Sequence, residues 1–283
     1  MSLISIGMPL YNAEKYVAEA LGSLLKQTHT DFEIIISDNG STDRTQEIVA
    51  SFAEKDDRIK IFKQSENLGP LRNFQFVLHQ AQGEYFLWRS YDDWSDDHYL
   101  ERLSSALDKN TDAELAVARL VQDNGTRQRI AGHELDYDGF DGRLLTRMYL
   151  LKSSHASWMY GLFRRNAVKT AIDAVLDTYP HVWAWDYLVL FPFALKGTIT
   201  TDYSTTFFQR ETGISSSVFR PKTAGAQIRL ANDFYRFCQR QLRLCEIGFF
   251  QTLWMSVYLL KFTSSRTEKF SRTLRILLRL RKP

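Results

Sequence analysis

The chain has 283 residues, a length that allows one large α/β domain with an appendage or two modest domains. Its 44% hydrophobic and 24% charged residues are ordinary for a folded soluble protein, and a formal net charge of +3 does not indicate a nucleic-acid binder. The two cysteines, Cys238 and Cys245, are too few for a metal-binding spacing and indicate buried thiols rather than a disulfide.

The sequence carries no signal of export or of a membrane span. Its first residues lead straight into an apolar strand and do not resemble a signal peptide. The longest apolar run, 249–262, is interrupted by Gln251, Ser256 and Lys261 and is too short to cross a bilayer. We therefore expect a cytosolic, reducing location.

Short apolar strands alternate with helical periods over the first ninety residues. We expect strands over 3–10, 32–37, 58–63 and 85–89, and helices over 13–27, 45–53 and 71–81. This β-α-β-α-β-α-β order predicts a mostly parallel sheet flanked by helices, with right-handed crossovers. The first part of the chain therefore reads as a Rossmann-like, nucleotide-binding half.

The strand over 85–89 is followed by two adjacent carboxylates, Asp92 and Asp93. Ligands of open α/β sheets lie outside the carboxyl ends of the strands, so these acids would enter the binding site. Carboxylate oxygens suit Mg²⁺ or Mn²⁺, which bridge to phosphates. The alternative is an Asp-rich turn that caps the next helix, with Ser95 or Asp96 as the N-cap residue before Tyr99.

The turns that follow the first two strands differ from those of dinucleotide and P-loop folds. Residues 9–14 lack the G-x-G-x-x-G pattern, and no G-x-x-x-x-G-K-[ST] occurs in the chain. They offer an aromatic ring, an amide and an acid, and Asp38 ends the second strand. Such groups can hold a nucleoside, while a metal ion at Asp92 and Asp93 would hold the diphosphate.

The first hundred residues contain five short sequence motifs. They are Pro9-x-Tyr11-Asn12-x-Glu14, Ser23-Leu24-x-x-Gln27-Thr28, the segment from Phe32 to Asp43, Asn67-x-Gly69, and Ala81-x-Gly83-Glu84-Tyr85 before the Asp-Asp pair. Together they closely resemble glycosyltransferase family 2, densely over residues 3 to about 102 and at isolated positions to about 215. The resemblance implies a GT-A fold and an inverting enzyme that uses nucleotide-sugar donors.

The resemblance also implies roles for individual residues. Those expected to contact the nucleotide-sugar are Pro9, Tyr11, Asn12, Glu14, Asp38, Asn39, Arg72, Tyr91 and Asp92. Asp92 matches the second acid of the family's D-x-D metal motif, and Asp93 would support it in holding Mn²⁺ or Mg²⁺. Ser90 replaces the first acid, which we read as a variant of the motif.

The second half offers the acceptor-side residues. We expect a strand over 113–120, a loop over 130–142 near the acceptor and a helix over 144–153, then a strand over 158–165 that precedes a helix. His155, Trp158 and Trp185 could face a sugar, although Trp158 is as consistent with a core position. The resemblance places the catalytic base at the start of the helix over 188–195, where Asp186 matches; a helix cap is the alternative.

Residues 197–206 are expected to form a strand pair, after which Arg210 could contact phosphate. The Gln-x-x-Arg-Trp motif of processive polysaccharide synthases is absent, which favours transfer of a single sugar. From 223 onward the pattern is helical, and 271–282 reads as a basic amphipathic helix. That helix could lie on anionic lipid, pack on its own protein or form an oligomer contact.

We therefore predict a metal-dependent inverting glycosyltransferase of surface polysaccharide or lipopolysaccharide assembly, peripheral on the cytosolic membrane face. A UDP-sugar is the favoured donor, and the acceptor is a saccharide or a lipid-linked saccharide. The expected domains are a GT-A domain over 1–220, with halves 1–102 and 103–220, and a helical extension over 221–283. The rivals are a catalytically silent nucleotide-binding module and a nucleotidyltransferase, which would need a glycine-rich, basic first turn.

Overall fold

The computed structural model describes residues 2–132, 134–135, 141–212, 219–245, 247–268 and 273–275. The contacts divide the chain into two compact units that interleave along the sequence. Unit 1 comprises Met1–Asp136, Ser157–Thr170 and Thr198–Gly213, and unit 2 comprises Tyr137–Ala156, Ala171–Gly197 and Ile214–Pro283. The predicted domains, 1–220 and 221–283, stay a prediction.

The first four strands of unit 1 form a parallel sheet in the order β3-β2-β1-β4. These strands are β1 (Ile4–Leu10), β2 (Phe32–Asp38), β3 (Ile59–Lys63) and β4 (Tyr85–Trp88). The helices α1 (Val17–Leu25), α2 (Thr45–Ala53) and α3 (Pro70–Gln80) connect them. This alternation confirms the expected Rossmann-like half, and it brings the carboxyl ends of β1, β2 and β4 to one edge of the sheet.

The remaining strands extend this sheet beyond β4. They are β5 (Trp94–Ser95), β6 (Leu115–Asp123), β7 (Gln128–Ala131), β8 (Leu162–Arg164) and β9 (Ile199–Arg210). The order continues β4-β8-β6-β9-β5, and β7 pairs with β6. β8 is antiparallel to both its neighbours, whereas β6 and β9 are parallel. The sheet is therefore mixed at this end and parallel where the nucleotide turns lie.

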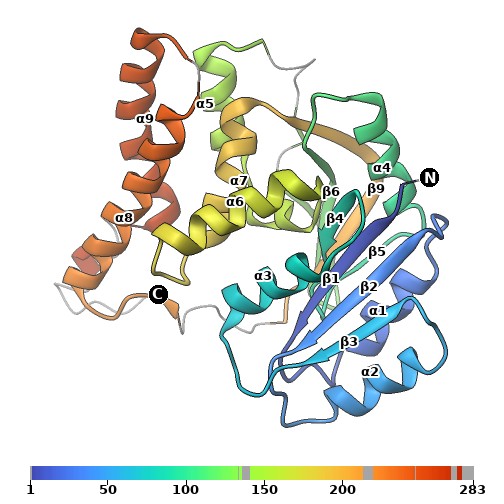
Figure 1. Ribbon diagram of the computed structural model, residues 1–283. Helices are drawn as coiled ribbons and strands as arrows, with labels where there is room; N and C mark the ends of the chain where they lie inside the picture. Colours follow the sequence, from blue (N-terminus) through green and yellow to red (C-terminus); the bar gives the residue numbers. More distant parts are fainter. Residues whose placement is uncertain are drawn as a thin grey trace. The chain divides into compact units, whose positions relative to one another are not determined.

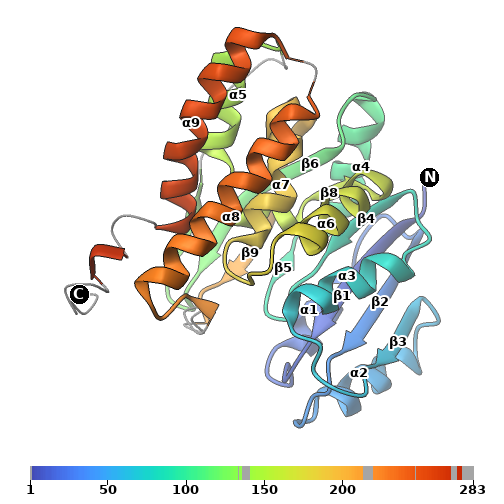
Figure 2. The same cartoon turned by 60° about the vertical axis from the view of Figure 1, so that its left-hand side comes forward.

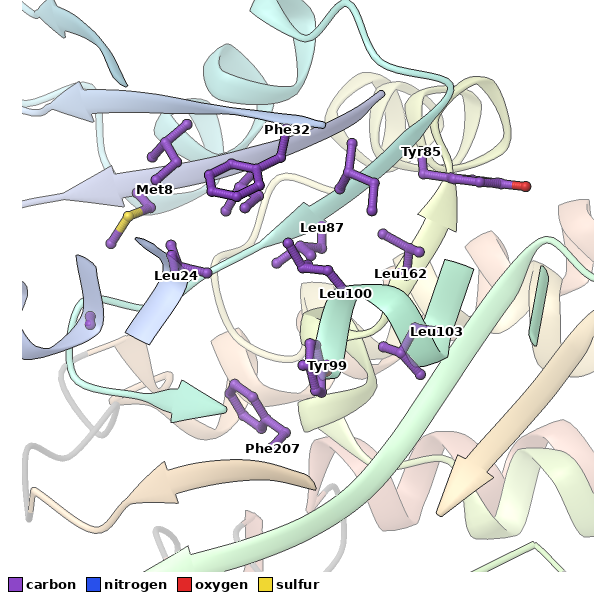
Figure 3. Packing of buried hydrophobic residues seen from close by; sticks show 14 of the residues in the cluster. Met8, Leu24, Phe32, Tyr85, Leu87, Tyr99, Leu100, Leu103, Leu162 and Phe207 are labelled. Atoms are coloured by element: carbon purple, nitrogen blue, oxygen red, sulfur yellow. The ribbon is translucent and has the colours of Figure 1, made fainter. Parts of the chain in front are cut away.

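Buried side chains fill both faces of the parallel sheet. On one face, α1, α2 and α4 (Tyr99–Lys109) pack their apolar stripes against Ile4, Ile6 and Met8 of β1. Figure 3 shows part of this cluster, where Tyr99 and Phe207 lie beside Leu100 and Leu103. On the other face lies α3 (Figure 1), whose Val77 leaves no space for a side chain at position 7.

Most predicted elements of unit 1 form close to their expected bounds, but four expectations differ from the structure. The helix predicted over 13–27 begins only at Val17, because the backbone N–H groups of Ala13 and Glu14 donate to Thr45 and Asp43. Neither Ser95 nor Asp96 is the N-cap of α4. His98 is the N-cap residue; the Asp96 carboxylate accepts its backbone N–H and also hydrogen bonds from Thr205 and Thr206.

The strand pair expected over 197–206 is one long strand, β9, with a bulge. Asp202 Oδ1 accepts the backbone N–H and the hydroxyl of Ser204, as in a turn. The pairing with β6 nevertheless resumes at Thr206, opposite Arg119, so the turn chemistry interrupts the strand without reversing it. The strand expected over 158–165 is shorter for a similar local reason: a 3₁₀ turn, Ala156–Tyr160, precedes β8.

Unit 2 is helical. It contains α5 (Leu144–Ser153), α7 (Trp185–Lys196), α8 (Ala224–Arg243) and α9 (Phe249–Thr267), and α6 (Arg165–Thr178) enters it from unit 1. The side chains of α7 are buried from Leu188 to Leu195 except at Pro192, and the Phe191 ring lies 5.9 Å from that of Phe262 on α9. Figure 2 shows α8 and α9 as long neighbouring helices.

The predicted basic helix over 271–282 lies outside the described residues except for 273–275, which are helical. Among the helices that the structure describes, none is long and apolar enough to cross a membrane.

Candidate functional site

The candidate donor site lies in unit 1, at the edge where β1 and β2 end. The register pairs Leu10 with Asp38, and the backbone N–H of Asn39 donates to the Leu10 carbonyl at 2.9 Å. The turns after the two strands therefore start side by side. β4 runs parallel to β1 as far as the pair Gly7 and Trp88, so the loop that carries the two acids also leaves this edge.

Two predicted contact residues of the first turn fasten it to the second turn. Asn12 has a positive φ of 50°, and its Oδ1 accepts the backbone N–H of Thr42 at 2.9 Å. Glu14 Oε2 accepts the backbone N–H of Arg44, just before α2, at 3.0 Å. Just before them in the chain, Tyr11 remains 46% exposed, and Pro9 is half-buried. The turn thus holds one aromatic ring open to a ligand.

The second turn is built on two buried polar side chains. Asp38 Oδ1 accepts the backbone N–H of Ser41, and Oδ2 accepts Gln46 Nε2 at 2.6 Å. Asn39 instead binds the turn that precedes α3: its Nδ2 donates to Asn67 Oδ1, and its Oδ1 accepts the Leu68 backbone N–H. Both carboxylate oxygens of Asp38 are thus hydrogen-bonded, and the residue is fully buried.

Arg72 lies on the first turn of α3 and is exposed to solvent. The helix begins after Gly69, whose φ of 80° lies in the left-handed region that glycine tolerates. The next residue, Asn73, is buried and donates from Nδ2 to the carbonyls of Leu10 and Ser37. Among the described residues no side chain pairs with Arg72, so its guanidinium is available at the edge formed by β1 and β2.

The two adjacent acids point to different partners. Asp92 is half-buried, and Ser90 Oγ donates to its Oδ1 at 2.5 Å. Asp93 is buried, and its Oδ1 accepts the backbone N–H of Arg210 at 2.9 Å. Burial, followed by the negative charge of Asp92, raises the pKa of Asp93 to about 7. Tyr91 lies half-buried before them, and burial raises the pKa of its hydroxyl as well.

Arg210, expected near phosphate, closes the acid loop from the end of β9. Its Nε donates to the backbone carbonyl of Asp92 at 3.1 Å, and its Nη2 pairs with Glu19 at 2.7 Å. The guanidinium lies over the rings of Tyr16 and Trp94, 4.6 and 4.7 Å from their centroids. In this arrangement Arg210 neutralises and positions the loop.

The side chains at this edge could hold a hard divalent cation only together with the phosphate oxygens of a bound substrate. The described residues contain no group of three or more His, Cys, Asp or Glu side chains that could hold a metal ion. Asp92 nevertheless has a carboxylate oxygen outside its bond to Ser90, at the edge described above. Mg²⁺ is commonly bound through one or two carboxylates plus substrate phosphates and water, which is the donor set that this edge would provide.

Sequence reasoning missed Arg89, the residue that follows β4. It is fully buried, its Nη2 donates to Ser95 Oγ at 2.9 Å, and its guanidinium lies over the rings of Tyr99 and Phe207. Its Nε and Nη1 have no hydrogen-bond partner among the described residues. Its charge also lowers the pKa of Asp93 against the larger effect of burial. An arginine that ends an apolar aromatic strand is the signal that could have revealed it.

The predicted base, Asp186, belongs to unit 2, where it lies in the first turn of α7. Its Oδ1 accepts the backbone N–H of Tyr187 at 2.9 Å. Burial raises the pKa of the carboxyl to about 6, and the nearby charge of Arg266 opposes that rise. A helix N-terminus favours an ionised carboxylate, but at Asp186 burial has the larger effect.

Arg266 of α9 is a second residue that the sequence pattern did not reveal. Its Nη2 donates to the carbonyls of Leu151, Lys152 and Ser154 at the end of α5, at 2.9–3.0 Å. Its guanidinium stacks on the Tyr187 ring at 4.4 Å. Arg266 therefore joins two helix ends beside the predicted base.

The other acceptor-side residues are divided between the units. His155 and Trp185 lie in unit 2 and are half-buried; burial and then the charge of Arg266 lower the pKa of His155. Trp158 lies in unit 1 and is 8% exposed, beside Tyr99 and Phe207 around a small cavity. That position agrees with the core alternative for Trp158.

Residues 5–171 match the family model described as Glycosyl transferase family 2. An uncharacterized glycosyltransferase of Haemophilus influenzae is 40% identical over 102 residues, which are 36% of this chain and 41% of that protein. Glycosyltransferase GlyG of Streptococcus pneumoniae is 31% identical over 140 residues, 50% of this chain and 42% of that protein. The match thus spans less than half of the length of these relatives.

Solved structures resemble the chain over almost its whole length. The crystal structure of S. aureus TarS 1-349 in complex with UDP-GlcNAc has a TM-score of 0.71 at 20% identity and covers 99% of this chain and 76% of that one. Mannosyltransferase PcManGT from Pyrobaculum calidifontis, in complex with GDP-Man and Mn²⁺, has a TM-score of 0.58 at 13% identity and covers 100% of this chain and 76% of that one. At these identities the likeness concerns the fold, and it confirms the predicted GT-A architecture.

Proposed function

Because the chain belongs to glycosyltransferase family 2, we propose that it is an inverting enzyme that moves one sugar from a nucleotide-sugar to a saccharide or lipid-linked acceptor. The process would be the assembly of a surface polysaccharide or lipopolysaccharide. A similar protein, TuaG of Bacillus subtilis, is named a putative teichuronic acid biosynthesis glycosyltransferase; it is 31% identical over 125 residues, 44% of this chain and 50% of that protein.

The observation that carries the proposal is that the polar segments after β1, β2 and β4 all leave the same edge of the parallel sheet. The exposed Tyr11 ring offers a face for a base, and Asp38 holds the neighbouring turn through hydrogen bonds from Ser41 and Gln46. The unpaired Arg72 offers positive charge for a diphosphate. A UDP-sugar is the favoured donor because the residues match the family's uridine-binding pattern. The complex of TarS with UDP-GlcNAc supports this choice.

Asp92 would hold Mn²⁺ or Mg²⁺ on the donor diphosphate, and Asp93 would support it from the buried side of the loop. The ion, when bound, would supply positive charge to the departing diphosphate. The Mn²⁺ named with PcManGT supports this cofactor. The Asp93 carboxylate accepts the backbone N–H of Arg210. The Arg210 side chain in turn donates to the Asp92 backbone carbonyl, so Asp93 helps to position Asp92.

Asp186 would act as the base. In a single displacement, the acceptor oxygen bonds to the anomeric carbon while the bond from that carbon to the diphosphate oxygen breaks, and the hydroxyl proton passes to the Asp186 carboxylate. A carboxyl with a pKa of about 6 is ionised at neutral pH yet binds a proton readily. His155 and Trp185, which share unit 2 with Asp186, would contact the acceptor.

We also propose a location on the cytosolic face of the membrane, with peripheral contact through the basic segment 271–282. An oligomer is compatible with the proposal, and neither nucleic acid nor any second cofactor is part of it.

Calorimetry tests the donor site directly. Binding of UDP, GDP and dTDP would be measured with and without Mn²⁺, on the wild type and on Asp92→Ala, with Asp97→Ala as the control. Asp97 is an exposed acid five residues further along the chain, between β5 and α4. We expect UDP binding that needs both Mn²⁺ and Asp92 and is unchanged in the control.

The other results have distinct meanings. Metal-independent binding that survives Asp92→Ala would remove the metal role. Tight binding of UDP without transfer to any acceptor would favour the silent module, for which Ser90 in place of an acid is the supporting observation. The absence of binding of any nucleotide would overturn the enzyme proposal.

A further inference from the structure

Helix α9 is apolar on both of its long faces. One face is buried, with Met255, Leu259 and Phe262 fully or almost fully enclosed in unit 2. The opposite face exposes six large apolar side chains: Phe249 at 77%, Phe250 at 76%, Leu253 at 54%, Trp254 at 63%, Val257 at 57% and Leu260 at 57%. We call these six residues the α9 apolar face. At 100° per residue they occupy one continuous arc of the helix.

Such a helix is unusual on a protein surface. A helix that is apolar all round is normally enclosed by protein or by lipid, whereas α9 has protein contacts on one side only, chiefly from α8 and α5. Single exposed apolar residues need no explanation, but a contiguous group of this kind marks an interaction site. α9 does not qualify as a membrane span, so a membrane partner would contact it along its length.

The charges in and after α9 along the sequence indicate what covers the α9 apolar face. The sequence has no acidic residue from 247 to 267, and residues 261–283 contain eight Lys or Arg against the single acid Glu268. In the structure Glu268 is paired with Arg220 at 3.5 Å and with Arg275 at 3.7 Å. The last 23 residues thus carry a net charge of +7 in a chain of +3, which leaves the first 260 residues at −4.

We propose that the α9 apolar face docks on an anionic lipid bilayer, with α9 lying in the plane of the interface. Aromatic and Leu side chains on a helix flanked by Lys and Arg are the composition of interfacial helices, in which apolar burial and attraction to anionic headgroups act together. The net positive charge that follows α9 in the sequence complements anionic headgroups, whereas a second copy of the chain would carry the same positive charge. The site is distinct from the segment 271–282 and does not depend on transfer activity.

Vesicle co-sedimentation of the full chain tests the proposal. The probes are vesicles of phosphatidylcholine alone and of phosphatidylcholine with phosphatidylglycerol. The variant is the double change Leu253→Ser/Trp254→Ser, and the matched control is Ile130→Ser/Leu145→Ser, which removes two apolar side chains that are 64% and 74% exposed elsewhere. We expect the wild type to sediment with the anionic vesicles and the variant to lose about tenfold or more in partitioning, while the control is unchanged.

A second measurement covers the case in which the double variant fails to fold. Trp254→Phe keeps an aromatic ring at the site, so it should still bind anionic vesicles, but quenching of tryptophan fluorescence by bromine-labelled acyl chains should fall sharply. Equal quenching in wild type and Trp254→Phe would overturn the proposal. So would unchanged vesicle binding of the double variant, equal losses in variant and control, or no binding by the wild type. A dimer of the wild type that is lost in the double variant without lipid would assign the face to a second copy.

Discussion

Burial sets the protonation of two carboxyl groups in this protein, each in a different unit. The pKa of Asp93 is raised to about 7 and that of Asp186 to about 6, in both cases chiefly by burial. In each case a backbone hydrogen bond, from Arg210 to Asp93 and from Tyr187 to Asp186, opposes the rise, and so does the charge of a nearby arginine, Arg89 or Arg266. Perturbed carboxyl groups of this kind are typical of functional sites.

The proposed base predicts a defined loss of activity. Asp186→Asn should lower sugar transfer by roughly 10²–10⁴-fold, because an amide cannot accept the acceptor's proton. Wild-type activity should also fall as the pH drops from about 7 to below about 6, where first Asp93 and then Asp186 becomes protonated. The groups facing Asp186 are Tyr187, Tyr179 and Arg266, and burial raises the pKa of both tyrosine hydroxyls further above this range.

Transfer rates with a nucleotide-sugar from pH 5 to 8 would show the acid limb, and calorimetry would show unchanged UDP binding in the variant. Retention of wild-type transfer by Asp186→Asn would assign Asp186 to the alternative role of a helix cap.

Glu33 shows the opposite case of a buried carboxyl with many partners. Burial raises its pKa, but hydrogen bonds from Lys60 at 2.7 Å, from Ser5 and from the Gln82 backbone outweigh burial, so the net shift is downward. A lowered pKa stabilises the fold above the usual value of about 4.5, and this stabilisation is lost as the pH falls through the folded-state pKa.

Glu33→Gln should therefore reduce the free energy of unfolding by about 1–3 kcal/mol at pH 7. The difference between variant and wild type should shrink below pH 4.5. Urea unfolding at pH 7 and pH 4 measures both values. A difference that stays the same at the two pH values would show that the charge of Glu33 is not the cause.

At the scale of elements, the site depends on how closely β4 approaches β1. The connection from α3 crosses the start of β1 at Gly83, whose N–H donates to Ser5 Oγ at 2.8 Å. A Cβ atom at this position would lie 2.5 Å from the Leu3 carbonyl oxygen and 2.8 Å from the Ser5 backbone nitrogen. Backbone atoms in a sheet cannot move away as the end of a side chain can, so this glycine permits the pairing that carries Asp92 to the edge.

Gly83→Ala should destabilise the protein by roughly 2–4 kcal/mol, at or above the upper range for overpacking. The matched control is Gly22→Ala in α1, where nothing lies within 4 Å of the added Cβ and where alanine favours a helix by about 0.5–1 kcal/mol. Thermal unfolding should show a lower Tm for the first variant and an equal or higher Tm for the second. Equal Tm values for Gly83→Ala and the wild type would contradict the close approach.

At the scale of the whole molecule, the helices after residue 220 are part of a packed unit. Phe234 of α8 and Phe262 of α9 have ring centroids 5.8 Å apart, and Phe262 also contacts Phe191 of α7. Gln227 Nε2 of α8 donates to the Thr267 carbonyl at the end of α9. Loss of these two helices would leave the apolar side of α7 without its partners.

A chain truncated to 1–220 should therefore unfold at a lower temperature, bind the dye ANS and aggregate, because apolar surface of unit 2 is exposed. A chain truncated to 1–268 keeps α8 and α9 and should retain the wild-type Tm, which makes it the control. Calorimetric scans of the three chains measure the effect. A cooperative, wild-type transition for 1–220 would show that the predicted domain folds independently of the extension.

The sequence by itself determined the βαβ half and the edge where the donor is expected to bind. Apolar periodicity and turn residues are local signals, and they placed α2, α5 and the first four strands within one or two residues of their observed bounds. The same signals located Asp92 at the end of β4 and Asp186 at the start of α7, because both follow directly from where an element begins or ends.

Only the tertiary structure decided the partners of these residues. Asp93 meets the Arg210 backbone 117 residues away, Arg89 is enclosed by Tyr99 and Phe207, and Arg266 reaches Tyr187 from the last long helix. The bulge that keeps β9 a single strand likewise depends on its pairing with β6. Contacts between distant segments depend on how whole elements pack, and no local period or spacing in the chain encodes that packing.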